Sequence, residues 1–277
     1  SFKRHSEYFT KFTHKEMINN LTQSKLRERF NPEGSTLRNH QLRMLEMLKY
    51  IDTICKKHDI KYWLCSGTLI GAVRHGGFIP WDDDVDIEML KEDYEKFVRV
   101  MEKEPHTNYA LQTHKTDFNY FLPYAKLRDL HSIIHEERNH DSYYKFHGCF
   151  IDIFIIEPSS SLFLSRVANT IWKVLLLSSD KLNKHIRKFY YPIAYSAFYH
   201  IAFPFIKSLS KWKSKGQYRL LGCSYYKPRN IKDIFPLQQF PFEDTNLPIP
   251  ANYHSYLQKI YGDYMQLPNL EKLKPHI

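Results

Sequence analysis

The residues best suited to chemistry form a short acidic run: residues 80–87 read Pro-Trp-Asp-Asp-Asp-Val-Asp-Ile. On an extended strand, side chains two positions apart point to the same face. Asp84 and Asp86 are therefore expected to converge, with Asp82 behind them and Asp83 on the opposite face. Crowded carboxylates repel one another unless a cation lies between them, and Mg²⁺ suits a site made of carboxylates and phosphate oxygens. The run predicts a metal site.

A second acid, Asp152, lies in the apolar segment 150–154, which is expected to be a central strand. Burying a lone carboxylate is costly unless the group is paired or bound to a metal. Joining the two segments predicts a triad of Asp84, Asp86 and Asp152 that holds one or two Mg²⁺ ions, with about 4 Å between two ions. Two simpler interpretations stay open. The run can be a solvated turn, and Asp152 can be a core carboxylate paired with an arginine.

The segment 66–77 carries groups that suit a phosphate. It follows a predicted strand and opens a short helix, so its free backbone N–H groups and the helix dipole favour an anion. Ser66 and Thr68 add hydroxyls, and Arg74 adds a forked cation. The glycines have the spacing of a Walker A loop, but the lysine and the hydroxyl residue of that motif are missing. Alone, the segment is explained by a tight turn; the acidic run that follows favours phosphate binding.

Elements that position these residues can be predicted from periodicity and caps. A helix is expected from Ser35 or Thr36 to about residue 58, followed by a strand over 61–66 and a helical turn over 67–73. Further strands are expected over 85–89, 109–114, 124–128 and 150–156, with helices over 91–104 and 251–261. This order is typical of an α/β or an α+β fold. Of the two we expect α+β, with a mixed sheet flanked by helices.

Charge is distributed unevenly along the 277 residues, which carry 40 Lys and Arg against 30 Asp and Glu. The segment 159–215 has ten Lys and Arg, eleven aromatic residues and a single acid, Asp180. Helices are expected over 162–177 and 193–206. A basic, aromatic helical insertion suits the interface of an anionic membrane, although a helical subdomain with a solvated basic face explains it nearly as well.

The predicted organisation has four parts. They are an N-terminal extension (1–34), a catalytic core (35–158), a basic helical subdomain for membrane or acceptor docking (159–230) and a C-terminal segment that packs on the core (231–277). No run of 18 uncharged apolar residues occurs, so a simple membrane span is not expected. The four cysteines form no C-x-x-C pair, which favours reduced thiols. We expect a cytoplasmic protein that is peripheral at the inner face of the plasma membrane.

Several stretches together resemble the LicD family of phosphocholine transferases, which is related to the fukutin-type transferases and has a nucleotidyltransferase-like core. The matching stretches are 66–75, 77–87, Lys-Leu-Arg-Asp at 126–129, 150–154 and, more loosely, Tyr-Gly-Asp-Tyr-Met-Gln-Leu-Pro at 261–268. The resemblance implies CDP-choline as the donor and a divalent metal as cofactor. It implies as acceptor a surface glycan or its lipid-linked precursor, of the teichoic acid or lipopolysaccharide type.

Carried over to this sequence, the family pattern implies roles for individual residues. Ser66, Gly67 and Thr68 match the phosphate-binding turn, Asp84 and Asp86 match the paired metal-binding acids, and Asp152 matches the third acid. Asp82 also lies within the family's aspartate run and is expected to contribute to the metal site. These residues are thus the expected catalytic and cofactor-binding set.

Cationic and aromatic side chains extend this expected site. Arg74, Lys126 and Arg128 are predicted to contact the donor phosphates, although each can equally be an ion-pair partner. A choline ammonium favours an aromatic cage. The cage candidates are Trp63, Trp81, Tyr120, Phe121 and Tyr124.

Three alternatives remain open from the sequence. The D-x-D pattern of residues 84–86 also suits a sugar transferase that holds a nucleotide sugar with Mg²⁺ or Mn²⁺. Related family members move other CDP-linked alcohol phosphates. A non-enzymatic basic module that binds nucleic acid or membrane gives no role to three aligned carboxylates, so no nucleic acid partner is expected.

Overall fold

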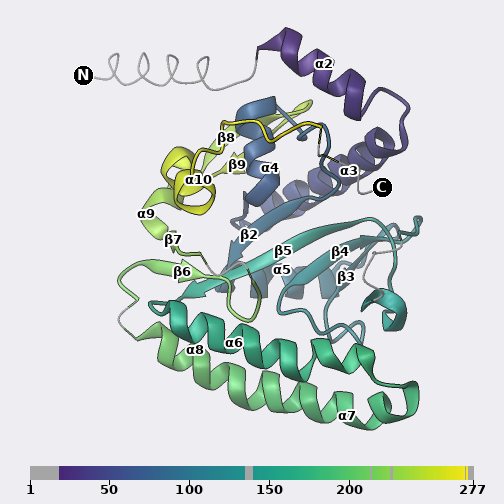
Figure 1. Ribbon diagram of the computed structural model, residues 1–277, viewed down its shortest axis with the longest axis vertical. Helices are drawn as coiled ribbons and strands as arrows, with labels where there is room; N and C mark the ends of the chain where they lie inside the picture. The colour runs from purple at the N-terminus through teal and green to yellow at the C-terminus, as the bar shows by residue number, and fades with distance from the viewer. Residues whose placement is uncertain (1–18, 135–139, 213, 225–226, 272, 274–277) are drawn as a thin grey trace.

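The computed structural model describes residues 19–134, 140–212, 214–224, 227–271 and 273 (Figure 1). Residues 1–18 of the predicted N-terminal extension and residues 272 and 274–277 of the C-terminal segment lie outside the described residues. The boundaries of the four predicted parts stay predictions.

A mixed sheet forms the centre of the molecule, with strand order β1-β2-β5-β4-β3. The strands are β1 (Trp63–Leu64), β2 (Asp86–Leu90), β5 (Phe150–Pro158), β4 (Ala125–Asp129) and β3 (Tyr109–Gln112). Strands β2 and β5 are parallel, whereas the other neighbours on this path are antiparallel. Beyond the main sheet, β6 (Gln217–Arg219) pairs with the end of β5 and with β7 (Arg229–Asn230). The predicted α+β class with a mixed sheet is confirmed.

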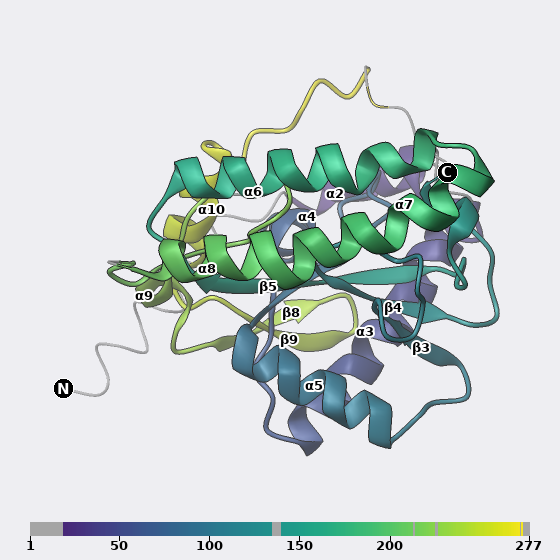
Figure 2. The ribbon, with the colours of Figure 1, turned by 90° about the horizontal axis from the view of Figure 1, so that it is seen from below.

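Two helices, α3 (Thr36–Lys57) and α5 (Lys91–Lys103), cover one face of the sheet (Figure 2). The expected start of the first helix is confirmed, because the Ser35 side chain accepts a hydrogen bond from the Arg38 N–H and caps α3. Apolar side chains of α3 and α5 pack with those of the inner strands in the main hydrophobic core. Residues of β2 and β5 that alternate with this core face are therefore free to carry polar groups.

A layer of three helices lies on the other side of the sheet: α6 (Leu162–Leu175), α7 (Lys184–Ser196) and α8 (Phe203–Lys211) (Figure 2). The segment 193–206 is helical as expected, but the helix that contains its start begins earlier than the sequence indicated. Helix α7 begins at Lys184, where the Asn183 side chain caps it, and it includes Pro192. A π-helical turn, Ala197–Ala202, joins α7 to α8. An aromatic cluster that includes Tyr191 and Phe198 packs beneath this layer, and this packing outweighs the missing N–H of the proline.

The C-terminal part contains a hairpin that the sequence did not predict. Strands β8 (Gln238–Phe242) and β9 (Thr245–Ile249) pair with each other alone, so each strand has an edge on which a proline is tolerated. Helix α9 (Ile231–Ile234) precedes the hairpin and α10 (Tyr253–Tyr261) follows it.

The remaining helical segments are short or lie outside these layers. They are α2 (Asn20–Phe30), α4 (Ser66–Ile70), the π-helical turn Gly71–His75, and the 3-10 helices His140–Tyr143 and Leu177–Lys181. None of the helices in the described part of the chain is both long and apolar enough to cross a membrane.

Candidate active site

Three predicted site residues form one row across the sheet. The register pairs Asp86 of β2 with Asp152 of β5, and pairs Asp152 with Lys126 of β4. Directly paired residues on neighbouring strands point to the same face. The Lys126 ammonium lies 3.0 Å from the Asp152 carboxylate, and both side chains are largely buried. The structure thus places two predicted carboxylates beside each other with one cation.

Asp82 and Asp84 lie directly before β2, and their carboxylates and that of Asp86 perturb one another's pKa values. Burial and the charges of Asp152 and Asp83 raise the pKa of Asp84 to about 6. Burial and the neighbouring acids also raise the pKa of Asp82 and Asp86 well above the usual range for aspartate. Lys126 opposes this effect at Asp84, because its charge lowers that pKa. Clusters of strongly shifted pKa values are typical of functional sites.

Helix α4 supports the acids from the side. The Thr68 hydroxyl accepts a hydrogen bond of 2.9 Å from the Asp86 N–H, which fixes the start of β2. A hydrogen bond from Ser66 lowers the pKa of Asp86 and partly offsets the effect of burial. A Cβ atom on Gly67 would lie 2.6 Å from an Asp82 carboxylate oxygen, so only glycine permits this approach. Ser66 and Gly67 therefore lie against the carboxylates of Asp86 and Asp82, whereas Thr68 holds the Asp86 backbone.

The three predicted phosphate-binding cations have different environments. Lys126 lies in the carboxylate row. Arg74 donates from Nη1 to the main-chain carbonyls of Tyr264 and Gln266, at 2.6 and 3.2 Å, and burial lowers its pKa to about 10. Arg128 is fully buried and donates to the Gln112 side chain and to a main-chain carbonyl. Both arginines therefore bind main-chain carbonyls in this structure, and the charge of Asp82 also acts on Arg74. The predicted phosphate contacts of Arg74, Lys126 and Arg128 stay predictions.

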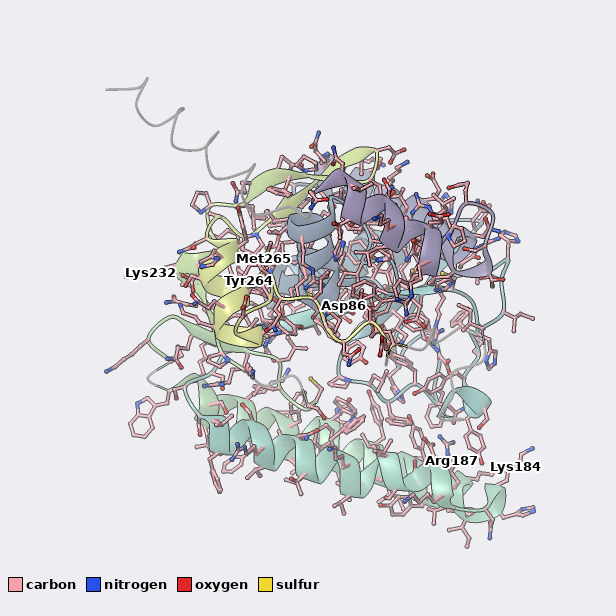
Figure 3. The ribbon with its side chains drawn as sticks, turned by 45° about the horizontal axis from the view of Figure 1, so that its top comes forward. Asp86, Lys184, Arg187, Lys232, Tyr264 and Met265 are labelled. Atoms are coloured by element: carbon pink, nitrogen blue, oxygen red, sulfur yellow. The ribbon has the colours of Figure 1, made fainter. Side chains whose placement is uncertain are left out.

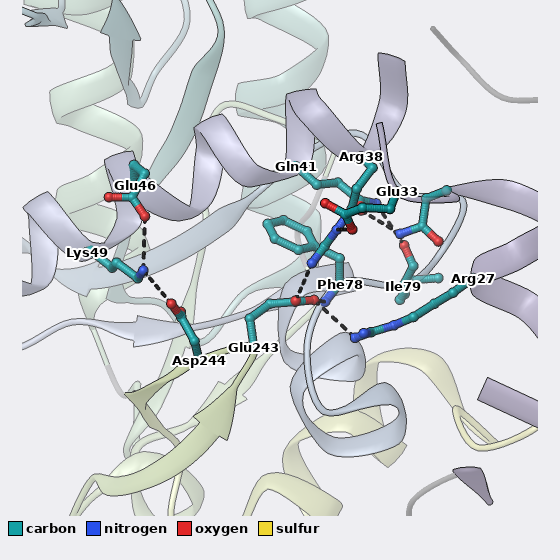
Figure 4. Close-up of polar contacts among 11 residues, drawn as sticks. Arg27, Glu33, Arg38, Gln41, Glu46, Lys49, Phe78, Ile79, Glu243 and Asp244 are labelled. Carbon is teal, nitrogen blue, oxygen red and sulfur yellow. Dashed lines mark hydrogen bonds and ion pairs between the residues drawn. The ribbon is translucent and has the colours of Figure 1, made fainter. Parts of the chain in front are cut away.

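A set of residues missed by the sequence analysis holds the acidic loop in place. Gln41 of α3 is fully buried and donates to the main-chain carbonyl of Asp82 at 2.8 Å. The Glu243 carboxylate, at the tip of the β8–β9 hairpin, accepts from Arg38 and from the Phe78 N–H, and it also pairs with Arg27 (Figure 4). The contacts of Glu243 connect residues more than 150 positions apart in the chain, so no local pattern could have indicated them.

Tyr261 is a further residue whose place the sequence analysis did not assign. It ends α10, and its phenol contacts the Ser66 hydroxyl and lies near Asp86. Burial is the main cause that raises the Tyr261 pKa, so the phenol stays protonated at neutral pH. In Figure 3 the C-terminal segment with Tyr264 and Met265 lies on the same side of the molecule as Asp86. The match of residues 261–268 to the family pattern was the available signal.

A buried ionic network anchors this C-terminal part to the sheet. Glu88, two residues after Asp86 on β2, is fully buried and forms an ion pair of 2.7 Å with Arg229. Its other carboxylate oxygen accepts from the Trp63 indole and the Tyr256 hydroxyl, at 3.0 and 2.7 Å. Since every partner comes from a different element, Glu88 fixes α10 and β7 against the strand that carries Asp86.

The aromatic cage candidates separate by burial. Trp63, Tyr120 and Phe121 are at most 1% exposed, so they are core residues. Trp81 and Tyr124 are partly exposed at the edge of the main core. Of the five candidates, these two alone could contact a ligand without a rearrangement of the core.

The carboxylate cluster has the ligand type that the divalent metal implied by the family would need. No three acidic, histidine or cysteine side chains among the described residues are arranged as ligands of one ion. The chemistry of the cluster nevertheless fits a hard divalent cation, because three of its carboxylates have pKa values raised in part by mutual repulsion. A cation would offset that repulsion and draw the oxygens together.

The chain is similar in sequence to known proteins of one family. The profile of the family described as LicD/FKTN/FKRP, nucleotidyltransferase domain, matches residues 59–205. The chain is 30% identical over 273 residues to the lipopolysaccharide cholinephosphotransferase LicD of Haemophilus influenzae, covering 87% of this chain and 96% of that protein. Over 48 residues it is 44% identical to human ribitol 5-phosphate transferase FKRP, covering 17% of this chain and 10% of FKRP. The chain belongs to the LicD/FKTN/FKRP family of nucleotidyltransferase domains.

Proposed function

We propose that this protein is a metal-dependent transferase that moves phosphocholine from CDP-choline to a hydroxyl of a cell-surface glycan or its lipid-linked precursor. The observation that carries the proposal is the row of Asp86, Asp152 and Lys126, flanked by Asp84 and Asp82. Such a set of buried, mutually repelling carboxylates beside one cation suits the binding of a metal–pyrophosphate group.

The choice of choline rests on the relatives. The similarity to the Haemophilus cholinephosphotransferase extends over 96% of that protein, whereas the similarity to the ribitol 5-phosphate transferase covers 10% of it. The Haemophilus relative is a lipopolysaccharide cholinephosphotransferase, which favours a lipopolysaccharide acceptor, and a teichoic acid is the alternative. The alternatives are transfer of another CDP-linked alcohol phosphate and transfer of a sugar from a nucleotide sugar. Titration with a panel of donors distinguishes them.

Each site residue receives a role in this proposal. Asp82, Asp84, Asp86 and Asp152 would hold Mg²⁺ or Mn²⁺, one or two ions, which when bound neutralise charge on the donor phosphates. Ser66, Gly67 and Thr68 keep the carboxylates and the start of β2 in position.

The transfer itself breaks one bond and forms one. The acceptor oxygen bonds to the phosphorus that carries choline, while the bond between that phosphorus and the bridging oxygen breaks and CMP leaves. Asp152 accepts the proton of the acceptor hydroxyl, and its ion pair with Lys126 holds its carboxylate in place. Lys126 stabilises negative charge on the transferred group.

A membrane surface is the proposed place of the reaction. The layer of α6, α7 and α8 exposes large apolar side chains over its outer side, among them Phe163, Phe189, Ile193, Phe205 and Trp212, each at least 66% exposed. Lysines and arginines lie on the same helices. Apolar residues that insert and cations that stay among anionic headgroups are typical of interfacial helices. Docking through this layer would bring a lipid-linked acceptor near the sheet.

Calorimetric titration of the purified protein with Mg²⁺ and a panel of donors tests the choice of donor. We expect CDP-choline to bind more tightly than CDP-ribitol, UDP-sugars and GDP-sugars. Preferred binding of CDP-ribitol would replace phosphocholine with ribitol phosphate as the transferred group. Preferred binding of a nucleotide sugar would replace the proposal with a glycosyltransferase.

A further inference from the structure

A surface cavity of about 280 Å³ lies outside the carboxylate site, at the start of α7. Its lining combines three cations, Lys184, Arg187 and Lys188, with aromatic side chains that include Tyr143 and Tyr191. Figure 3 shows Lys184 and Arg187 together at one end of α7. The roles proposed above for the carboxylate site do not use this group.

Arg187 is the central feature of the cavity. It is only 4% exposed, and its Nη1 donates to the Asn119 side chain at 2.7 Å. Its Nε and Nη2 atoms are buried and have no hydrogen-bond acceptor among the described residues. The Asp180 carboxylate lies 3.6 Å from Nη2, which is an ion pair but too long for a hydrogen bond. Because buried donors are normally satisfied, two open donors of one guanidinium indicate a missing acceptor.

The guanidinium is held in place for such an acceptor. Its central carbon lies 3.9 Å from the centre of the Tyr143 ring and 4.5 Å from the centre of the Tyr191 ring. Stacking on two aromatic faces fixes the plane of an arginine side chain. Because Nη1 bonds Asn119 and the two rings hold the plane of the guanidinium, the edge formed by Nε and Nη2 is left to contact a ligand. This edge suits the paired oxygens of a phosphate.

The field around the cavity is positive. Lys184 and Lys188 are exposed and lie four residues apart, so they share one face of α7. The first turn of α7 contains no acid, and its backbone end adds positive character. Among the described residues, Asp180 and Asp117 are acids whose charges raise the pKa of Tyr191, after the larger effect of burial. The described residues therefore place three cations and two carboxylates at or near the cavity.

We propose that this cavity binds a phosphate ester, with the phosphate on Arg187, Lys184 and Lys188 and the carbon skeleton against the aromatic rings. This assignment rests on the proposed function: the cavity would be a subsite for a phosphate-bearing part of the acceptor. The phosphate belongs either to a phosphorylated sugar of the glycan or to a lipid headgroup, and the two sources share the chemistry that the cavity recognises.

Calorimetric titration with two probes tests the subsite without the donor reaction. The probes are a hexose 6-phosphate and a short-chain phosphatidylglycerol kept below its micelle concentration, with the unphosphorylated hexose as the blank. The variant Lys184→Ala/Lys188→Ala removes two of the cations. The matched control, Lys173→Ala/Lys211→Ala, removes two exposed lysines of the same helical layer that do not line the cavity.

We expect at least one probe to bind the wild type and the control alike, and to bind the cavity variant about tenfold more weakly, as for the loss of charge-assisted bonds. The probe that behaves in this way identifies the source of the phosphate. Arg187→Lys, with its folding checked by thermal melting, should weaken the same probe because the fork is lost. Equal affinity of cavity variant and control for both probes, or no binding of either probe, overturns the proposal.

The donor site provides an independent readout in the same experiment. CDP-choline affinity should be unchanged in the cavity variant, because none of its residues belongs to the carboxylate site. If CDP-choline fails to bind any of the proteins while the phosphate ester still requires Lys184 and Lys188, the proposed function fails and the subsite stands.

Discussion

At the scale of single residues, the site depends on how closely carboxylates approach one another and the backbone. Asp82 lies against Gly67, Asp86 is held through its N–H by Thr68, and Asp152 is paired with Lys126. Each contact constrains one carboxylate, so small changes at these positions should alter activity more than folding.

Gly67→Ala tests the approach of Asp82. The new methyl group would lie 2.6 Å from the Asp82 carboxylate, which must rotate away, while the end of a side chain can move without unfolding the protein. We expect transfer activity to fall about tenfold or more, as for a misplaced catalytic group, with little change in melting temperature. In an Asp82→Ala background the same change should add almost no further loss, since its target is absent. Additive losses would refute this explanation.

The metal-free protein should lose stability as the pH rises. The pKa of Asp84 is about 6 in the folded state, whereas an unfolded aspartate titrates near ~3.9. The folded state therefore binds this proton more tightly, and the stabilisation is lost as the pH rises from about 4 through 6. Melting in EDTA should show a decline between about pH 4 and pH 6 that Asp84→Asn reduces. Added Mg²⁺ should stabilise the protein more at pH 8 than at pH 5; an equal effect at both would contradict the reasoning.

At the scale of elements, distant parts of the chain hold the site together. The tip of the β8–β9 hairpin fixes the loop before the acidic run through Glu243, and α10 and β7 meet β2 at Glu88. The C-terminal part therefore contributes to the position of β2 as well as covering the sheet.

The substitution Glu88→Gln should lower the free energy of unfolding more than a substitution at the surface does. The substitution leaves the buried Arg229 without its charged partner, and breaking a buried pair in this way costs about 3–5 kcal/mol. Chemical denaturation measures the loss. Glu104→Gln removes an exposed acid that pairs with Lys57 and serves as the control; similar losses in the two variants would show that the network is not a structural anchor.

The elements also show what a sequence can and cannot predict. The acids on two expected strands were joined into a triad that includes Asp86 and Asp152, and the Ser35 cap predicted the start of α3, because each signal lies within one short segment. Arg229 lies 141 residues from Glu88, and nothing near either residue indicates the pair. The hairpin β8–β9 was missed because proline is excluded from central strands but not from the edges of a two-stranded sheet.

At the scale of the whole molecule, two surfaces on one helical layer serve the proposed reaction. The outer side of α6, α7 and α8 exposes apolar side chains, and the start of α7 carries the phosphate-binding cavity. The carboxylate row lies on the sheet, and the charge of Asp152 reaches Tyr120 in the aromatic cluster beneath these helices. Membrane docking, acceptor binding and transfer are thereby assigned to different parts of the chain.

Membrane docking can be tested by removing apolar side chains alone. Phe189→Ser/Phe205→Ser should reduce binding to phosphatidylglycerol-containing vesicles about tenfold or more, because two exposed phenyl rings would no longer insert. Sedimentation with vesicles measures this. Leu21→Ser/Ile133→Ser removes two residues of similar exposure outside this layer and should bind as the wild type does. Equal binding by all three proteins would rule out docking through α7 and α8.

Release of CMP from CDP-choline is the most direct test of the transferase itself. The purified protein with Mg²⁺ and a glycan acceptor should form CMP and phosphocholine-modified glycan in equal amounts. Asp86→Asn and Asp152→Asn should each lower the rate about 10²-fold or more, the effect of removing one charge-stabilising group, while melting curves show that both remain folded. Near-normal turnover by either folded variant would contradict the assignment of the row Asp86–Asp152–Lys126 as the catalytic centre.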